Sequence, residues 1–130
     1  MKKEELDNLA TRIIGCAISV HKELGAGLLE NVYKQCLKIA LEEEGLKVES
    51  EVPLPVCFRG RKITDEGYRL DLLVEDTIIL ELKSVSQLAE VHAKQLGTYL
   101  RLADKRLGLL INFNETLLKN GIKRIINGYF

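Results

Sequence analysis

Two apolar segments near the middle of the chain carry charged residues inside them. The segments are Tyr68-Arg-Leu-Asp71-Leu-Leu-Val74 and Ile78-Ile-Leu-Glu81-Leu-Lys83, and both are typical of buried strands. Because successive strand residues face opposite sides of a sheet, Glu81 and Lys83 share one face. Burying single charges costs several kcal/mol each. These charged side chains must therefore form ion pairs, bind a cation or line an open cleft.

The length of the loop between the two strands decides whether the acids meet. In an antiparallel pair, residues directly opposite each other lie on the same face of the sheet. A two-residue turn would place Asp71 opposite an apolar residue. A three-residue loop over residues 75–77 places Val74 opposite Ile78 and Asp71 opposite Glu81, with Cβ atoms roughly 5 Å apart. We expect the three-residue loop.

Two carboxylates at that separation repel each other, and a hard divalent cation relieves the repulsion. Mg²⁺ prefers oxygen ligands and keeps several waters, so a phosphate oxygen and a water can reach it. Lys83, on the same face, can stabilise the charge that develops on a phosphate. The alternative is an Asp–Lys–Glu salt-bridge network at the rim of the sheet, with no chemistry attached.

The rest of the sequence predicts helices around these strands. Apolar residues at helical spacing predict two helices, over residues 6–24 and 29–44, that form an N-terminal helical hairpin. A third helix is expected over residues 86–103. It is followed by a buried strand over residues 107–113, and the order of elements suggests a parallel crossover.

Alternating apolar residues predict a further strand before the central pair, over residues 46–58. Pro53 and Pro55 place it at an edge of the sheet or make it irregular, and residues 60–62 are predicted to turn. A last short strand is expected over residues 122–126. The expected fold class is therefore α/β (α+β), with a mixed central β-sheet flanked by helices in three layers.

Composition limits the possibilities further. A chain of 130 residues with 46% hydrophobic residues fits one domain, residues 1–130, and excludes a disordered chain. No apolar run reaches the roughly 18–20 residues that span a bilayer, so we expect a cytoplasmic protein with no membrane contact. Three cysteines without a C-x-x-C pair argue against a disulfide framework and a zinc site. The 19 basic and 19 acidic residues balance, so charge alone does not indicate nucleic-acid binding.

Two motifs resemble those of a known family. Asp71 with Glu81-Leu82-Lys83 resembles the signature of the PD-(D/E)XK nuclease superfamily, although Leu70 stands where the signature has proline. Gly27-Leu-Leu-Glu30-Asn-Val-Tyr33 resembles the motif of the GxxExxY proteins, a branch of that superfamily. The resemblance covers nearly the whole chain and implies a restriction-endonuclease-like core.

The resemblance also implies roles for the strand residues. Asp71, Glu81 and the carbonyl of Leu82 would bind Mg²⁺ or Mn²⁺, and Lys83 would be the electrostatic catalyst. Glu30, from the second helix, would join them as a catalytic residue that orients water or binds metal. Its alternative role is structural, because a carboxylate in the first turn of a helix is stabilised by the helix dipole.

Gln95-Leu-Gly-Thr-Tyr99 resembles the Q-x-x-x-Y element of RecB-like members of the superfamily. It implies that Gln95 orients a phosphate or a water. Tyr33 and Tyr99 are expected to contact substrate, and the alternative for Tyr99 is a core ring with a satisfied hydroxyl.

The expected function is that of a Mg²⁺-dependent nuclease, a hydrolase that cleaves phosphodiester bonds of nucleic acid, with DNA as the first choice of partner and a homodimer left open. The alternative is a non-catalytic nucleic-acid-binding or protein-interaction module that keeps the nuclease fold. Neutral charge and small size favour the module, whereas the intact Asp, Glu and Lys set favours the enzyme.

Overall fold

A five-stranded mixed sheet forms the centre of the computed structural model, which describes residues 1–128 except for the side chains of residues 65 and 66. The strands lie in chain order: β1 (Val48–Phe58), β2 (Arg61–Val74), β3 (Ile78–Lys83), β4 (Leu107–Asn112) and β5 (Ile122–Ile126). Strands β3 and β4 are parallel, and the other neighbouring pairs are antiparallel. The parallel pair confirms the predicted crossover.

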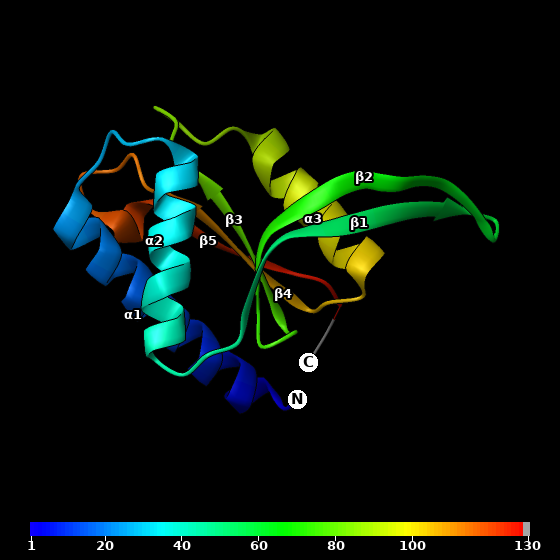
Figure 1. Ribbon diagram of the computed structural model, residues 1–130, viewed down its shortest axis with the longest axis horizontal. Coiled ribbons are helices and arrows are strands. Elements are labelled where there is room, and N and C mark those ends of the chain that lie inside the picture. Colours follow the sequence, from blue (N-terminus) through cyan, green and yellow to red (C-terminus); the bar gives the residue numbers. More distant parts are fainter. Residues whose placement is uncertain (129–130) are drawn as a thin grey trace.

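Helices cover both faces of this sheet (Figure 1). They are α1 (Lys3–Leu24), α2 (Glu30–Glu43) and α3 (Glu90–Ala103), with a short 3₁₀ helix, η1 (Leu118–Gly121), before β5. One apolar cluster joins α1 and α2 to the sheet, and a second joins α3 to the opposite face. The predicted three-layer arrangement and the N-terminal helical hairpin are thus confirmed. None of the helices within residues 1–128 is both long and apolar enough to cross a lipid bilayer.

The loop between β2 and β3 has the predicted length. Val74 pairs with Ile78, so residues 75–77 form the three-residue connection. Glu75 and Asp76 adopt positive φ angles of 53° and 50° to make the turn. The regular pairing then runs back only to Leu72 opposite Leu80. Asp71 and Glu81 come next, where the ladder between the two strands ends.

Strand β2 is twisted at Asp71. Leu70 packs in the cluster beneath α3, whereas Leu72 packs in the cluster beneath α1 and α2. In a regular strand, residues two apart face the same side. The change of side shows that β2 rotates between these two leucines, and it places Asp71 where the sheet opens.

Strands β1 and β2 form a longer hairpin than predicted. β2 begins at Arg61 and not at Tyr68, where the apolar segment starts, because the turn is made by Arg59 and Gly60 and not by residues 60–62 as predicted. The φ angles of Arg59 and Gly60 are 50° and 76°. Phe58 and Arg61 face each other across this two-residue turn, as in hairpins with both central residues at positive φ. We call residues 55–64, the distal part of the hairpin, the arm. The arm extends beyond the rest of the fold (Figure 1).

The segment after β3 is held by a buried asparagine. The Asn112 side chain accepts a hydrogen bond from the Val85 N–H at 3.0 Å and donates one to the Val85 carbonyl at 2.9 Å. This segment is not helical at first, and α3 begins at Glu90 and not at residue 86 as predicted. The paired hydrogen bonds fix the chain just beyond Lys83, and so fix the end of β3.

The joint between α1 and α2 depends on Tyr33. This side chain is completely buried, and its ring stacks on Phe113 with 4.4 Å between centroids. Its hydroxyl donates to the Gly25 carbonyl at 2.5 Å and accepts from the Leu28 N–H at 3.1 Å. The tyrosine therefore determines where α2 begins, and with it the position of Glu30.

We expect Tyr33→Phe to lower the free energy of unfolding by about 1–2 kcal/mol, because the ring packing is kept while two backbone groups lose their partner. Urea denaturation measures the difference. Tyr68→Phe is the matched control, since the Tyr68 side chain is 45% exposed and should change stability by less than about 0.5 kcal/mol. Equal effects of the two substitutions would contradict the proposed role of the Tyr33 hydroxyl.

Candidate active site

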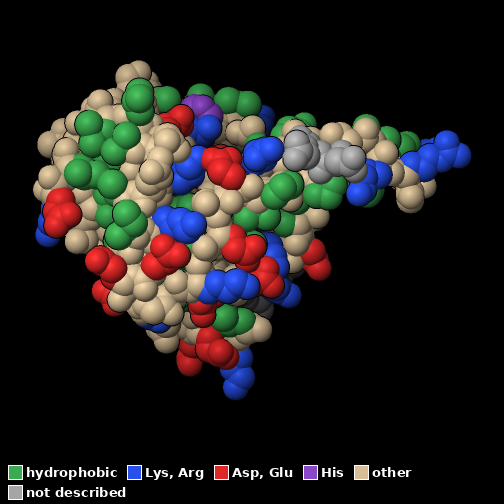
Figure 2. Space-filling view, viewed as in Figure 1, with side chains coloured by type: hydrophobic (Ala, Val, Ile, Leu, Met, Phe, Trp, Pro, Cys, Tyr) green, Lys and Arg blue, Asp and Glu red, His purple; other side chains and the backbone are tan. Residues whose placement is uncertain are grey.

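A pocket of about 410 Å³ opens where β2, β3 and the start of α2 meet. Its lining residues come from these three elements: Leu29, Glu30, Asn31, Lys34, Asp71, Glu81, Leu82 and Lys83. Figure 2 shows acidic and basic side chains interspersed between α2 and the base of the hairpin. Of the site residues predicted from sequence, the pocket brings together Glu30, Asp71, Glu81, Leu82 and Lys83.

Hydrogen bonds between side chain and backbone link the two strand acids. One Asp71 carboxylate oxygen, Oδ2, accepts from the Leu82 N–H at 2.8 Å, and Glu81 Oε1 accepts from the Asp71 N–H at 3.3 Å. These contacts take over where the regular pairing of β2 and β3 stops. One oxygen of each carboxylate is thereby held by a backbone N–H. The second oxygen of each carboxylate bonds to neither of these two N–H groups.

Burial makes both acids difficult to ionise, and the charge of Asp71 adds to this effect at Glu81. The Glu81 side chain is only 5% exposed. Burial first, and then the charge of Asp71, raise the pKa of Glu81 to about 8. Burial also raises the pKa of Asp71, although the hydrogen bond from Leu82 opposes the shift. Perturbed acids in a cleft are typical of functional sites.

Lys83 lies beside the acids without forming a salt bridge to either one. Its positive charge lowers the pKa of both Asp71 and Glu81. Among the residues that the structure describes, the ion pairs within 4 Å involve other lysines and arginines. The alternative of an Asp–Lys–Glu salt-bridge network is therefore not what this geometry shows.

Glu30 is the first residue of α2 and is exposed at the mouth of the pocket. Its charge contributes to the raised pKa of Glu81, so the two carboxyls act on each other across the pocket. Glu30 thus lines the same pocket as the strand acids, but from the exposed first turn of α2 and not from a buried position.

Sequence reasoning did not identify Lys34 as part of the site. Lys34 lies four residues after Glu30, on the same side of α2, and it forms an ion pair with Glu51 of β1. Its charge lowers the pKa of Asp71. The i, i+4 spacing from Glu30 was the available signal.

The two tyrosines expected to contact substrate do not line the pocket. Tyr33 is completely buried, and its hydroxyl bonds to backbone groups on both sides, so the structure replaces the expected substrate contact with a structural one. Tyr99 is 6% exposed and packs in the cluster beneath α3, with its ring 5.6 Å from that of Tyr68. Burial, and then the charges of Glu81 and Asp71, raise the pKa of Tyr99 to about 12. Tyr99 thus packs in the cluster beneath α3, close enough to the two acids for their charges to raise its pKa.

Gln95 lies on α3, one turn before Tyr99, and is half-buried. It is not among the residues that line the pocket. The pocket that holds the two acids is therefore lined by α2, β2 and β3, and α3 contributes no lining residue to it.

The chemistry of the donor atoms suits a hard divalent cation. Asp71, Glu81 and the carbonyl of Leu82 offer oxygen ligands. The pKa of Glu81 is raised by burial first and then by the charge of Asp71, and a bound cation would relieve the repulsion between the two acids. The described residues contain no group of three or more His, Cys, Asp or Glu side chains arranged to hold a metal. A cation here would accordingly keep several waters, which is the habit of Mg²⁺.

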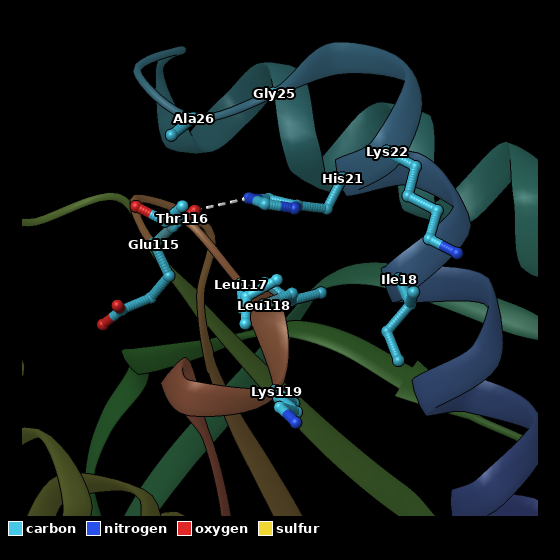
Figure 3. Close-up of a pocket in the computed structure, with 10 residues that line it drawn as sticks. All are labelled: Ile18, His21, Lys22, Gly25, Ala26, Glu115, Thr116, Leu117, Leu118 and Lys119. Carbon is cyan, nitrogen blue, oxygen red and sulfur yellow. Dashed lines mark hydrogen bonds between the residues drawn. The ribbon is translucent and has the colours of Figure 1, made fainter.

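A larger cavity, of about 570 Å³, lies elsewhere, between the end of α1 and the segment before η1 (Figure 3). Ile18, Leu117 and Leu118 contribute to its apolar lining. Its histidine, His21, lies with Nε2 2.7 Å from the Glu115 carbonyl and so joins the two segments. Because this cavity contains neither strand acid, we place the candidate site in the smaller pocket.

Most of the chain matches a known protein family. Residues 7–125 match the family described as the PD-(D/E)XK nuclease superfamily. No curated protein and no solved structure gave a match. Together with the mixed sheet between helices, the family match confirms the expected restriction-endonuclease-like core. It identifies the superfamily and not a branch within it.

Proposed function

Because the chain belongs to the PD-(D/E)XK nuclease superfamily, we propose that it is a Mg²⁺- or Mn²⁺-dependent nuclease that hydrolyses phosphodiester bonds of DNA. The observation that carries this proposal is the coupled pair of Asp71 and Glu81 in one pocket with a lysine that forms no salt bridge to them. A purely structural site would neutralise these charges among themselves. This one leaves two buried acids for a cation and one amine for an anion.

We propose that Asp71, Glu81 and the carbonyl of Leu82 hold the cation. When bound, a divalent cation would neutralise the two carboxylates and polarise the scissile phosphate. The hydrogen bond from the Leu82 N–H to Asp71 keeps one ligand fixed to β3, so the two strands cannot separate without disturbing the site.

The remaining residues act on phosphate and water. Hydrolysis adds a water oxygen to phosphorus and breaks one P–O ester bond, and negative charge accumulates on the phosphate. The Lys83 ammonium, on the same side as the acids, stabilises that charge. Glu30, exposed at the mouth of the pocket, accepts a hydrogen bond from the water and orients it. Gln95 contributes to orienting substrate from α3.

We also propose that the chain belongs to the GxxExxY branch of the superfamily. The support comes from Gly27, Glu30 and Tyr33, which occupy the motif positions. Gly27 adopts a φ angle of 98°, which favours glycine, and Tyr33 closes the joint that places Glu30.

The test of the cation site is isothermal titration with Mn²⁺ in the millimolar range. We expect wild type to bind weakly, because water supplies most ligands, and Asp71→Asn to show no binding. Asp76→Asn is the matched control, since Asp76 is an exposed acid in the next turn of the chain, paired with Lys105.

Cleavage of single- and double-stranded DNA with Mn²⁺ is measured beside the titration. Wild type and the Asp76 control should cleave, whereas Asp71→Asn should not. Identical heats in wild type and Asp71→Asn, together with binding of DNA but no cleavage, would instead support the non-catalytic module.

A further inference from the structure

We propose that the arm, residues 55–64, binds double-stranded nucleic acid by entering a groove of the duplex, next to the part of the duplex that is held at the pocket. We call this binding role the grip. The proposal rests on the proposed function for its partner. Four observations carry it: the position of the arm, its charge, its exposed apolar side chains and its shape.

The arm does not belong to the packed body of the protein. Val52, Leu54 and Leu70 at its base pack beneath α3. Residues 55–64 appear in neither apolar cluster. A two-stranded ribbon alone is only marginally stable in water, so extending it beyond the core needs a reason other than stability.

Positive charge is concentrated in the arm. Arg59, Arg61 and Lys62 lie within its ten residues, which include no acid, while the whole chain has a formal net charge of zero. Lys and Arg side chains occupy the end of the arm in Figure 2. Asp65 and Glu66 follow in the sequence, outside the described side chains. The inference depends on Arg59 and Arg61, whose charge complements phosphate.

Large apolar side chains are exposed beside these cations. Phe58 is 60% exposed and Ile63 is 64% exposed. The Arg59 guanidinium lies over the Phe58 ring, 4.9 Å from its centroid. On such a surface the cations can contact phosphates and the apolar side chains can contact the walls of a groove. A nucleic-acid duplex presents both phosphates and groove walls.

The arm is a bulged two-stranded ribbon, a shape that the major groove of a duplex admits. The major groove of B-form DNA is about 12 Å wide and admits a two-stranded β-ribbon. The pairing of β1 and β2 shifts register between Leu54 and Val56 and again before Cys57. Such bulges bend a ribbon and increase its twist. Gly67 lies at the bend, where a Cβ atom would come within 2.6 Å of Thr64 Cγ2.

The length of the arm predicts how much duplex it needs. Arg61 and Asp71 belong to the same strand, ten residues apart, which corresponds to about 30 Å at the usual rise of a strand. That distance covers about nine base pairs at 3.4 Å each. Because the ribbon is bent, this straight-strand length is an upper bound, and a duplex centred on the pocket needs to extend by up to about nine base pairs to one side for the arm to touch it.

The experiment compares two variants that remove the same number of positive charges. Arg59→Gln/Arg61→Gln changes the arm, and Lys22→Gln/Lys119→Gln changes two exposed lysines beside the cavity in Figure 3. Binding to a 30-base-pair duplex and to a duplex of eight base pairs is measured by fluorescence anisotropy in EDTA at several salt concentrations. These probe lengths are about three times and just under the predicted reach of about nine base pairs.

We expect the arm variant to bind the long duplex about tenfold to a hundredfold more weakly at 0.1 M salt, with a salt dependence smaller by about two phosphate contacts. The lysine variant should bind as wild type does, and the short duplex should not distinguish the three proteins. Arg59→Lys/Arg61→Lys keeps the charges and should restore the salt dependence. Equal losses in the arm and lysine variants, or an equal loss on single strands of the same length, would overturn the proposal.

Failure of the grip and failure of the nuclease proposal can be told apart. If wild type and the arm variant bind and cleave the long duplex equally well, the grip alone is refuted. A wild type that binds the long duplex through the arm without cleaving it refutes the nuclease alone. A wild type that binds no duplex refutes the grip, and the Mn²⁺ titration then decides the cation site separately.

Discussion

Glu81→Gln should make the metal-free protein more stable at pH 8.5 and abolish cleavage. In the folded wild-type protein the pKa of Glu81 is about 8, against an ordinary value of 4.5. Between these two values, the folded state holds a proton that the unfolded state has lost. Stability therefore falls as the pH rises from about 4.5 through 8, and the penalty is fully present above pH 8.

Glutamine removes this penalty and keeps the oxygen that accepts the Asp71 N–H. The difference between the two pKa values corresponds to an upper bound of roughly 4–5 kcal/mol at 1.36 kcal/mol per pH unit. We expect a large part of that gain at pH 8.5 and almost none below pH 4.5. The melting temperature of the variant should also depend less on pH than that of wild type.

Thermal melts in EDTA between pH 5 and 9 measure this effect, beside cleavage assays with Mn²⁺. Glu90→Gln is the control, because Glu90 is an exposed acid at the start of α3 and should change stability by less than about 0.5 kcal/mol. A Glu81→Gln protein that melts below wild type at pH 8.5 would mean that Lys83 needs Glu81 as a partner, as in a structural salt-bridge network. An inactive wild type with that result would remove the basis for the enzyme.

Lys83→Ala should reduce cleavage by about 10²–10³-fold while leaving Mn²⁺ binding intact or slightly tighter. The loss follows from removing the charge that stabilises the phosphate. Binding is spared because the oxygen ligands remain and one competing positive charge disappears. The metal-free protein should lose a little stability at alkaline pH, since Lys83 lowers the pKa of both acids.

Lys34→Met provides the comparison for Lys83. Both lysines lie in the pocket and both lower the pKa of Asp71, but Lys34 is paired with Glu51. We expect its loss to reduce cleavage by less than tenfold. Single-turnover cleavage and Mn²⁺ titration of the two variants make the test, and similar losses in both would show that only the total positive charge matters.

Local pattern was enough to predict the centre of the site. Alternation along a strand places Glu81 and Lys83 on one face, and the length of the loop at residues 75–77 then sets Asp71 near Glu81. These relations span at most thirteen residues and depend on steric rules of the backbone. They hold in the structure because nothing distant is needed to enforce them.

Other features needed contacts between distant parts of the chain. Glu30 and Lys34 reach the pocket only because the start of α2 lies beside β2 and β3, and Tyr33 takes its structural role only because its ring stacks on Phe113. A stripe of apolar residues shows which face of a helix turns inward, but it does not show which strand that face will meet. The expected substrate contact of Tyr33 therefore could not be distinguished from burial.

The sequence by itself determined the order of the elements, the edge or irregular character of β1 through Pro53 and Pro55, and the register that brings Asp71 beside Glu81, because each depends on residues close together in the chain. Only the tertiary structure decided the reach of the arm, the twist of β2 at Asp71 and the raised pKa of Glu81. These three features arise from burial and from bends that accumulate over many residues. A pattern of alternating apolar residues is the same in a ribbon that packs on the core and in one that extends beyond it.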